Sequence, residues 1–288
     1  MTSFLRPYTT RVDNSFDKKR IKDYIITIQC SLDGFSYSVF DETIATFIVL
    51  EHYNIIKQDA GIEQVIDEFQ ERKNIELQEY KRAVILIDNT LNTFVPANFF
   101  LNKHKDDFMR FLNLSDDDSF ILTDYIARVD INNIFAINKS DGIYLNNLPE
   151  NVTIAHASSV MINSLINENL NRNHDSRVFV NVKNDYFELV IMNGCILVFH
   201  NYFRYKTTED FVYFLIFATS QFNIDNETVP LYFLGHIENT SKILELCSRY
   251  FRDIRFMRKP VEIQLTKDLE EEPYHQHYII YNAIKCEL

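Results

Sequence analysis

Two carboxylates and two nitrogen-bearing side chains are candidate parts of a binding site for a nucleotide or a sugar phosphate. Asp33 and Asp185 each follow an apolar run, 152 positions apart, while Lys183 precedes the second aspartate and His236 follows a later apolar run. If the carboxylates faced each other across a cleft and Lys183 attracted phosphate, they would suit a nucleotide- or sugar-phosphate-binding enzyme. The alternative is that both aspartates are turn residues that hydrogen-bond the nearby backbone. We expect the turn role, because hairpin dipeptides surround both positions.

The segments around these aspartates are two copies of one pattern. CSLDGFSYSVFDETIATF at 30–47 aligns without a gap with VKNDYFELVIMNGCILVF at 182–199. The offset of 152 pairs Ile28 with Val180, Cys30 with Val182, Asp33 with Asp185, Phe35 with Phe187, Val39 with Ile191, Ile44 with Ile196 and Phe47 with Phe199. Asp-Gly in the first copy and Asn-Gly in the second are typical of two-residue hairpin turns. Each copy therefore predicts a meander of three antiparallel strands.

The residues after each meander predict the same order of elements. Helical spacing predicts a helix over 61–80, and the run AVILID predicts a strand buried on both faces at 83–88. Pro96 suits the first position of a further helix that runs to about Leu112. In the second half we expect a capped helix over 207–222, a strand over 229–237, a helix over 239–250 and a strand over 253–257. Each half thus has the order βββαβα, with a mixed sheet and helices outside.

Additional segments distinguish the first half and set the expected domain boundary. Residues 119–137 predict an inserted hairpin, and residues 149–170 predict a long amphipathic helix. The polar stretch 167–177 is the natural junction between the halves. We therefore expect one domain over residues 1–172 and a second over residues 173–288. Helical spacing in the tail predicts a C-terminal helix that packs back on the first domain.

Composition and charge exclude several classes of function. The chain has 288 residues, 46% of them hydrophobic, and a formal net charge of −12. Nucleic-acid binding needs a positive face that neutralises phosphates, so we expect no nucleic-acid partner. The longest apolar run, FVYFLIFA at 211–218, is too short for a membrane span of about 20 residues. The lack of a signal-peptide pattern and of CxxC spacing predicts a cytoplasmic location with reduced thiols.

A duplicated βββαβα unit whose first three strands form a meander resembles the ribonuclease-H-like fold. Two such units in tandem resemble the actin-like ATPase superfamily, which includes actin, chaperone ATPases, sugar kinases and pilus-assembly actin-like proteins. The chain also resembles an uncharacterised bacterial family of unknown function with this fold. The resemblance covers nearly the whole chain and implies an α/β fold of two mixed-sheet lobes with flanking helices. It also implies that a nucleotide with magnesium would bind between the lobes.

In that superfamily each opening hairpin is a phosphate loop, and this chain departs from its pattern in both copies. The loop carries an Asp that positions metal and water, and a Gly that lets backbone N–H groups approach phosphate. The first copy, IQCSLDG, has Gln29 at the Asp position and Ser31 at the Gly position. The second copy, VNVKNDY, has Asn181 and Lys183 there. An amide is no general base and binds a hard cation less strongly than a carboxylate, so we expect no catalytic residues.

The adenosine-contacting Gly-Gly of the superfamily is also incomplete. FLGHIEN has Gly235 at the first glycine position and His236 at the second, and the whole chain has five glycines. The candidate cleft residues are therefore Gln29, Ser31, Asp33, Gly34, Asn181, Lys183, Asp185, Gly235 and His236. We expect no cofactor and no metal at them. ATP with magnesium would bind only if the cleft has been rebuilt as an enzyme site.

Three other polar motifs have a functional and a structural interpretation. His275 and His277 would share a face and could ligate metal on a strand, but they diverge on the helix expected there. His156 and Ser158 lack a nucleophile elbow, and we interpret them as structural polar positions. The acidic run at 115–119 lacks the Gly and the distal Glu of an EF-hand, and we interpret it as a solvated turn.

These observations leave functional hypotheses of different classes. The first is a catalytically inactive pseudo-ATPase that acts as a cytoplasmic adaptor or scaffold by binding another protein. The second is a degenerate nucleotide- or sugar-phosphate-binding enzyme that uses the inter-lobe cleft. A structural subunit of a homodimer is a third. We favour the first because the scaffold is kept while the phosphate chemistry is missing.

Overall fold

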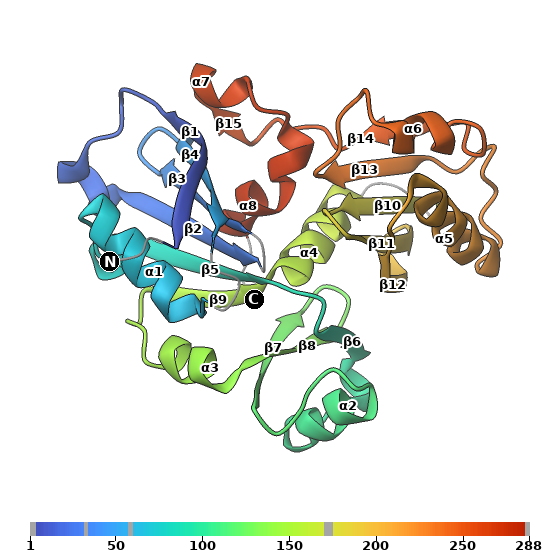
Figure 1. Ribbon diagram of the computed structural model, residues 1–288, viewed down its shortest axis with the longest axis horizontal. Coiled ribbons are helices and arrows are strands. Elements are labelled where there is room, and N and C mark those ends of the chain that lie inside the picture. The colour runs from blue at the N-terminus through green and yellow to red at the C-terminus, as the bar shows by residue number, and fades with distance from the viewer. Residues whose placement is uncertain (1–3, 32–33, 57–59, 170–174, 286–288) are drawn as a thin grey trace. The chain divides into compact units, whose positions relative to one another are not determined.

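The computed structural model describes residues 4–31, 34–56, 60–169 and 175–285, and its elements are labelled in Figure 1. The chain forms two compact units. Unit 1 comprises Met1–Met161, Val261–Glu272 and Ile279–Leu288, and unit 2 comprises Ile162–Pro260 and Pro273–Tyr278. The boundary expected between residues 172 and 173 lies outside the described residues.

Unit 1 is built around a seven-stranded mixed sheet. Its order is β1–β4–β3–β2–β5–β9, with β15 also paired to β4 (Figure 1). The strands are β1 (Leu5–Val12), β2 (Tyr24–Ser31), β3 (Gly34–Asp41), β4 (Thr46–Ile55), β5 (Arg82–Asp88), β9 (Val152–His156) and β15 (Gln264–Leu265). The meander of β2, β3 and β4 is antiparallel, whereas β5 runs parallel to β2 and β9 parallel to β5. The central strands β2 and β5 are almost wholly buried, which explains their near-continuous apolar sequences.

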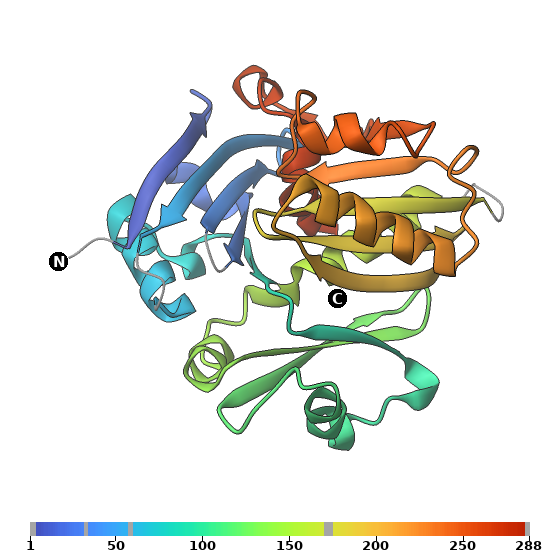
Figure 2. The same ribbon diagram turned by 45° about the vertical axis from the view of Figure 1, so that its right-hand side comes forward.

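Unit 2 is built around a five-stranded sheet with the order β12–β11–β10–β13–β14. The strands are β10 (Ser176–Val182), β11 (Tyr186–Asn193), β12 (Ile196–Arg204), β13 (Leu231–Gly235) and β14 (Ile254–Phe256). Two adjoining helices, α5 (Thr208–Gln221) and α6 (Lys242–Cys247), cover one face of this sheet (Figure 2). The predicted capping box is confirmed, since Oγ1 of Thr207 accepts from the Asp210 N–H at 3.1 Å.

The two meanders match strand for strand, as the repeated sequence predicts. β3 and β11 begin and end 152 positions apart, and so do the first residues of β2 and β10. The pairing between the central and the third strand of each meander, β3 with β4 and β11 with β12, also shifts register at the same place. The shift lies between Val39 and Phe40 in unit 1 and between Ile191 and Met192 in unit 2. The extra residue lies in the third strand of each meander, at Ile48 of β4 and at Val198 of β12, and a β-bulge of this kind bends and twists its strand locally.

The gapless alignment is wrong beyond the second turn of each meander. Four residues form the turn between β3 and β4, whereas Gly194 and Cys195 alone form the turn between β11 and β12. In register, Phe47 therefore corresponds to Leu197 and not to Phe199. Gly194 has a φ of 58°, which suits the first central position of a two-residue hairpin turn.

The segment between β5 and β9 forms a separate three-stranded sheet with the order β6–β8–β7. Its strands are β6 (Asn92–Pro96), β7 (Ser119–Ile126) and β8 (Ile131–Asn138), and β7 and β8 form the hairpin expected over 119–137. The helix predicted from Pro96 is wrong, because Pro96 ends β6 and the helix α2 spans only Lys105–Phe111. Proline is tolerated there because β6 is an edge strand.

Three other predicted helices differ in length from the observed ones. Of the helix predicted over 149–170, the first part is β9, and only Ala157–Asn169 form the helix α4. The β-branched residues of β9 pair with β5, which outweighs their helical spacing. The helix predicted over 239–250 is the shorter α6, which begins after the N-cap Ser241. The helix predicted over 61–80 is α1 (Ile62–Lys73), which ends where Asn74 adopts a left-handed conformation.

The remaining helices are α3 (Lys139–Asn146), α7 (Lys267–Glu270) and α8 (Tyr278–Asn282). In the core of unit 1, the ring of Phe69 on α1 lies 5.1 Å from Phe35 and 4.7 Å from Tyr37 of β3. Near the C-terminal end, the ring of Tyr281 on α8 lies 4.7 Å from Phe47 of β4. Within the described ranges, no helix is long and apolar enough to cross a bilayer.

Candidate functional site

The first predicted phosphate turn follows β2 in unit 1. The half-buried Gln29 donates from Nε2 to Oδ2 of Asp88 at 2.7 Å. Asp88 is the last residue of β5, is 7% exposed, and lies in register with Ser31. Oγ of Ser31 donates to the carbonyl of Gly34 at 2.9 Å. The amide at the superfamily's aspartate position thus bonds a carboxylate on the neighbouring strand of its own sheet.

The other two candidates of this turn are less informative. Asp33 lies outside the described residues. A Cβ on Gly34 would lie 3.4 Å from Oγ of Ser31, which is ordinary van der Waals contact. Gly34 begins β3 and pairs with Asn54 of β4. The described chain therefore does not require a glycine at position 34.

Asn181, the counterpart of Gln29, bonds a different neighbouring strand. Its Nδ2 donates to Oε2 of Glu188 at 3.0 Å, and Oε1 of Glu188 lies 2.7 Å from Nε2 of His200. The three residues lie on β10, β11 and β12. The side chains of Glu188 and His200 are only 4% and 6% exposed, and Asn181 is buried. A buried carboxylate needs such partners, because an unpaired buried charge costs much free energy.

The second predicted phosphate turn, around Lys183 and Asp185, is closed by hairpin hydrogen bonds. The Lys183 N–H donates to the carbonyl of Tyr186 at 2.9 Å. The hydroxyl of Tyr205 donates to the Lys183 carbonyl at 2.7 Å, and the Tyr205 N–H donates to the carbonyl of the exposed Asp185 at 3.1 Å. Burial, and then the Asp185 charge, raise the pKa of Tyr205. The Lys183 N–H is therefore used within the hairpin.

Gly235 is required by the packing of two strands. Its φ is +82°, and a Cβ there would lie 2.3 Å from the carbonyl oxygen of Val182 and 2.5 Å from Oδ1 of Asn181. The N–H of the exposed His236 donates to the same Val182 carbonyl at 2.8 Å. The space that the missing side chain leaves is therefore filled by β10. Glycine is needed here for the approach of β13 to β10.

The structure brings the predicted residues together within each unit. Gln29, Ser31 and Gly34 gather at the end of β2, and Asn181, Lys183, Asp185, Gly235 and His236 gather at the adjoining ends of β10 and β13. The sequence analysis missed the carboxylates Asp88 and Glu188. Glu188 had a visible signal, because it is the one charged residue in the apolar run YFELVIM. Over the described part of the chain, no group of three or more His, Cys, Asp and Glu side chains is placed to hold a metal ion.

A second buried polar network surrounds His156 in unit 1. Nδ1 of His156 accepts from the Ser158 N–H at 3.1 Å, and the His156 N–H donates to Oδ2 of Asp124 at 2.7 Å. Nδ2 of Asn133 donates to Oγ of Ser159 at 2.8 Å. Burial raises the pKa of Asp124 to about 6, although hydrogen bonds from Ser159 and His156 oppose the shift. The network joins the three-stranded sheet to the start of α4.

The remaining polar motifs have ordinary structural contacts. His275 lies in a 3₁₀ turn, with Nε2 2.8 Å from the carbonyl oxygen of Ile237 and its ring 4.4 Å from Phe256. Burial lowers the pKa of His275. In the acidic run, Oδ1 of Asp116 accepts from Oγ of Ser119 at 2.8 Å. That bond lowers the pKa of Asp116 and belongs to a surface turn.

Comparison with known proteins identifies the family. The family model described as "Protein of unknown function (DUF3822)" matches residues 13–254, most of the chain. The chain belongs to this family. None of the curated proteins matches the DUF3822 chain in sequence.

Solved structures show the fold of this DUF3822 member. A Bacteroides thetaiotaomicron VPI-5482 protein with an actin-like ATPase fold and unknown function matches with a TM-score of 0.78 and 16% identity, over 95% of this chain and 100% of that one. A chain of the PilM-PilN type IV pilus biogenesis complex matches with a TM-score of 0.58 and 9% identity, over 89% and 96% respectively. The DUF3822 chain therefore has the predicted actin-like ATPase fold.

Proposed function

We propose that the protein is a protein-binding scaffold with an actin-like fold that does not hydrolyse ATP. The observation that carries the proposal is a continuous row of aromatic side chains in unit 2, which we call the aromatic patch. It consists of Phe199 and Phe203 of β12 and Tyr213, Phe214 and Phe217 of α5. The patch extends from the edge strand of the sheet to the outer side of α5.

Ring contacts connect the whole aromatic patch. Ring centroids lie 6.4 Å apart for Phe199 and Phe203, 5.8 Å for Phe203 and Phe214, 5.4 Å for Phe214 and Tyr213, and 6.2 Å for Tyr213 and Phe217. Tyr213 is 62% exposed and Phe217 is 51% exposed, whereas the other three members are half-buried and pack against the core of unit 2. Single exposed apolar residues are normal, but contiguous ones mark interaction surfaces. Aromatic residues are also enriched at the buried centres of protein interfaces.

The edge strand beside the patch indicates what kind of partner would bind. In the part of the chain that is described, no strand pairs with the outer edge of β12. Ile196 and Val198 on this strand are 60% and 43% exposed. A long apolar edge strand is a template for pairing with another strand. The partner is therefore an extended segment that adds to β12 and places alternate apolar side chains on the aromatic patch.

Hydrogen bonding in unit 2 supports the absence of ATP chemistry. A phosphate loop presents backbone N–H groups and a glycine surface to its ligand. Here the N–H groups of Lys183 and His236 bond carbonyls of the hairpin and of β10. The surface of Gly235 is covered by Val182 and Asn181. The N–H groups of Lys183 and His236 and the surface of Gly235 are therefore used in contacts within the sheet of unit 2.

The likeness to the PilM-PilN complex supports a protein partner by analogy of fold. That structure is an assembly of two proteins, and one of its chains has the architecture seen here. Because one fold hosts many functions, the analogy identifies neither the partner nor its binding surface. The aromatic patch is the surface at which binding of a protein partner can be tested.

Cross-linking in the native cell, followed by mass spectrometry, tests the proposal. The wild-type chain is compared with a Y213S/F217S variant, and Tyr250→Ser serves as the control because Tyr250 is also an exposed unit 2 tyrosine, 49% exposed. We expect one specific partner, whose yield falls about tenfold or more in Y213S/F217S and is unchanged in the control. Hydrogen exchange with the captured segment should then protect the backbone amides of β12.

Two outcomes would contradict the proposal. One is a partner yield that Y213S/F217S leaves unchanged. The other is a wild-type chain that elutes as a dimer and becomes monomeric in Y213S/F217S, which would assign the aromatic patch to a second copy. Thermal unfolding of each variant checks that the substitutions leave the fold intact, because single surface substitutions typically change stability by about 0.5 kcal/mol or less.

A further inference from the structure

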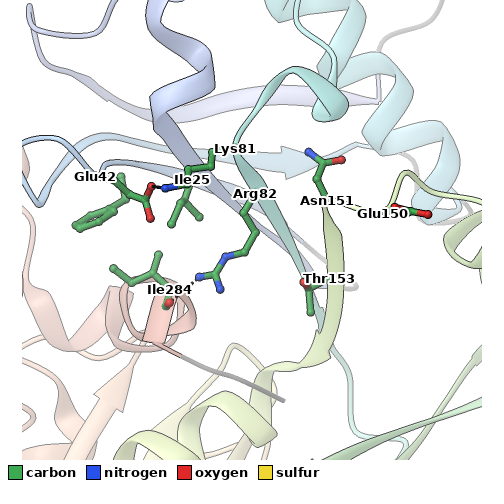
Figure 3. A pocket seen from close by; sticks show the side chains of 9 residues that line it. Ile25, Glu42, Lys81, Arg82, Glu150, Asn151, Thr153 and Ile284 are labelled. Atoms are coloured by element: carbon green, nitrogen blue, oxygen red, sulfur yellow. Dashed lines mark hydrogen bonds and ion pairs between the residues drawn. The ribbon is translucent and has the colours of Figure 1, made fainter.

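Unit 1 contains a cavity of about 480 Å³ where strands β2, β5 and β9 begin (Figure 3). Apolar side chains of Ile25, Phe40 and Ile284 line it, together with the polar Arg82 and Thr153. Ile25 lies near the first residue of β2, so the cavity is at the opposite end of this strand from Gln29. It is therefore separate from both predicted phosphate turns.

Among the described residues, Arg82 is the cation of this cavity that forms no ion pair. The half-buried side chain donates from Nη2 to the Ile284 carbonyl at 2.6 Å, and its buried Nε has no hydrogen-bond partner. The adjacent Lys81, by contrast, forms an ion pair with Glu42. A buried polar nitrogen without a hydrogen-bond partner costs free energy. An anion within the cavity would supply the missing partner.

We propose that this cavity binds a small monocarboxylate with an apolar tail. The carboxylate pairs with the Arg82 guanidinium, whose planar donors match a carboxylate. The tail packs against Ile25, Phe40 and Ile284. The ligand should carry no more than one negative charge, because Lys81 and Glu42 offset each other and Glu150, although it points away from Arg82 (Figure 3), already balances Arg82 in the total charge of the lining. The same charges disfavour phosphate and polyphosphates.

The view of the cavity agrees with this arrangement. Arg82 extends toward Ile284, Lys81 is turned to Glu42, and Glu150 points away from Arg82 (Figure 3). Because Arg82 is the first residue of β5 and pairs with Ile25 of β2, the sheet fixes its backbone. The site is independent of the protein-binding role proposed above, since it uses unit 1 residues alone.

Titration calorimetry of the full chain with a panel of monocarboxylates tests the inference. The panel runs from acetate to octanoate and includes 4-methylpentanoate, with 4-methylpentanamide as the neutral equivalent and inorganic phosphate as a second anion. We expect saturable one-site binding of at least one branched or medium-chain acid. The amide should bind at least about tenfold more weakly, because it loses charge-assisted hydrogen bonds. Phosphate should not displace the acid.

Variants assign the binding to the cavity. Arg82→Gln should weaken acid binding about tenfold or more, and Thr153→Leu, which fills the cavity and keeps Arg82, should also weaken it. The matched control K81Q/E42Q removes a cation and its partner together and should change affinity less than about threefold. The inference is overturned if no acid in the panel binds, if phosphate displaces the acid at equal concentration, or if Thr153→Leu and Arg82→Gln bind like the wild type. If Arg82→Gln does not fold, Thr153→Leu decides.

Discussion

The two meanders are copies of one unit, but their outer strands lie in different surroundings. In unit 1, β4 pairs with β3 on one side and with β1 and β15 on the other, and most of its residues are buried. In unit 2, the equivalent β12 is the sheet edge, and its residues are half-buried or exposed, although the side chain of His200 is only 6% exposed. The same pattern thus serves as core in one unit and as surface in the other. This difference directs the search for a binding surface to unit 2.

The polar residues at the end of each first strand differ as well. Gln29 bonds Asp88 on the parallel neighbour β5, whereas Asn181 bonds Glu188 on the antiparallel neighbour β11. Glu188 then contacts His200, so the unit 2 side chains extend across three strands. Both amides therefore act inside their own sheets. Gln29 and Asn181 thus occupy equivalent positions and are both polar, but their hydrogen-bond partners lie on different neighbouring strands.

The largest expected effect concerns the glycines of the two units. Gly235→Ala should lower the free energy of unfolding by about 3 kcal/mol or more, because φ is +82° and the new Cβ would overlap β10. Gly34→Ala is the matched control and should change it by less than about 1 kcal/mol, since its Cβ has room. Urea unfolding of the three proteins provides the measurement. Equal losses in both variants would mean that Gly235 has no special role.

The next effect concerns the insertion that only unit 1 carries. Burial raises the pKa of Asp124 to about 6 in the folded state, above the value near 3.9 of an unfolded chain. The folded state then binds the proton more tightly, so the contribution of Asp124 to stability falls as pH rises from about 4 to about 6. Compared with Asp124→Asn, the wild type should lose roughly 2–3 kcal/mol of unfolding free energy between pH 4 and pH 7.

Urea unfolding of the wild type and Asp124→Asn at four pH values measures this difference. The subtraction removes the titration of groups that the two proteins share. A difference that stays constant with pH, or that grows as pH rises, would show that Asp124 is not the buried titrating group.

The smallest expected effect compares the side-chain contacts of two equivalent central-strand residues, Glu188 and Ser36. Their histidine partners are not at equivalent positions, since His52 corresponds to Tyr202. Oε1 of the Glu188 carboxyl group lies 2.7 Å from Nε2 of His200 in unit 2. In unit 1 the counterpart of Glu188 is Ser36, whose uncharged hydroxyl lies 2.6 Å from Nδ1 of His52. A double-mutant cycle with Glu188→Gln and His200→Gln should give a coupling of about 2 kcal/mol. The cycle with Ser36→Ala and His52→Gln should give about 1 kcal/mol or less. Equal couplings would contradict the charge-assisted role of Glu188.

The sequence predicted the duplicated architecture because both copies of the meander repeat their apolar positions and turns. It did not predict the register of the third strand. The two turns differ by two residues, and the apolar pattern matches in either register. Pro96 and the segment after it were assigned to a helix because Pro suits a helix start, but Pro also suits the end of an edge strand. For the third strand and for Pro96, the local sequence was therefore compatible with two different structures.

The candidate site was only partly visible for a related reason. Gln29, Asn181 and Gly235 were found from their places in the repeat, but their partners depend on tertiary pairing. Asp88 lies 59 positions from Gln29 and is brought to it by the parallel pairing of β2 and β5. The aromatic patch was not predicted either, because an aromatic run in α5 has the same sequence pattern whether a partner or the core covers it.

The central claim is that the turns after β2 and β10, which correspond to the phosphate loops of the superfamily, do not bind nucleotide and make their contacts within their own sheets. The most direct measurement is urea unfolding of the full chain with and without about 1 mM ATP and magnesium. A nucleotide site with a Kd of about 10 μM would raise the free energy of unfolding by about 2.7 kcal/mol under these conditions. The account predicts no change beyond the ionic-strength control. A stabilisation of that size, dependent on magnesium and reduced by Lys183→Ala, would contradict it.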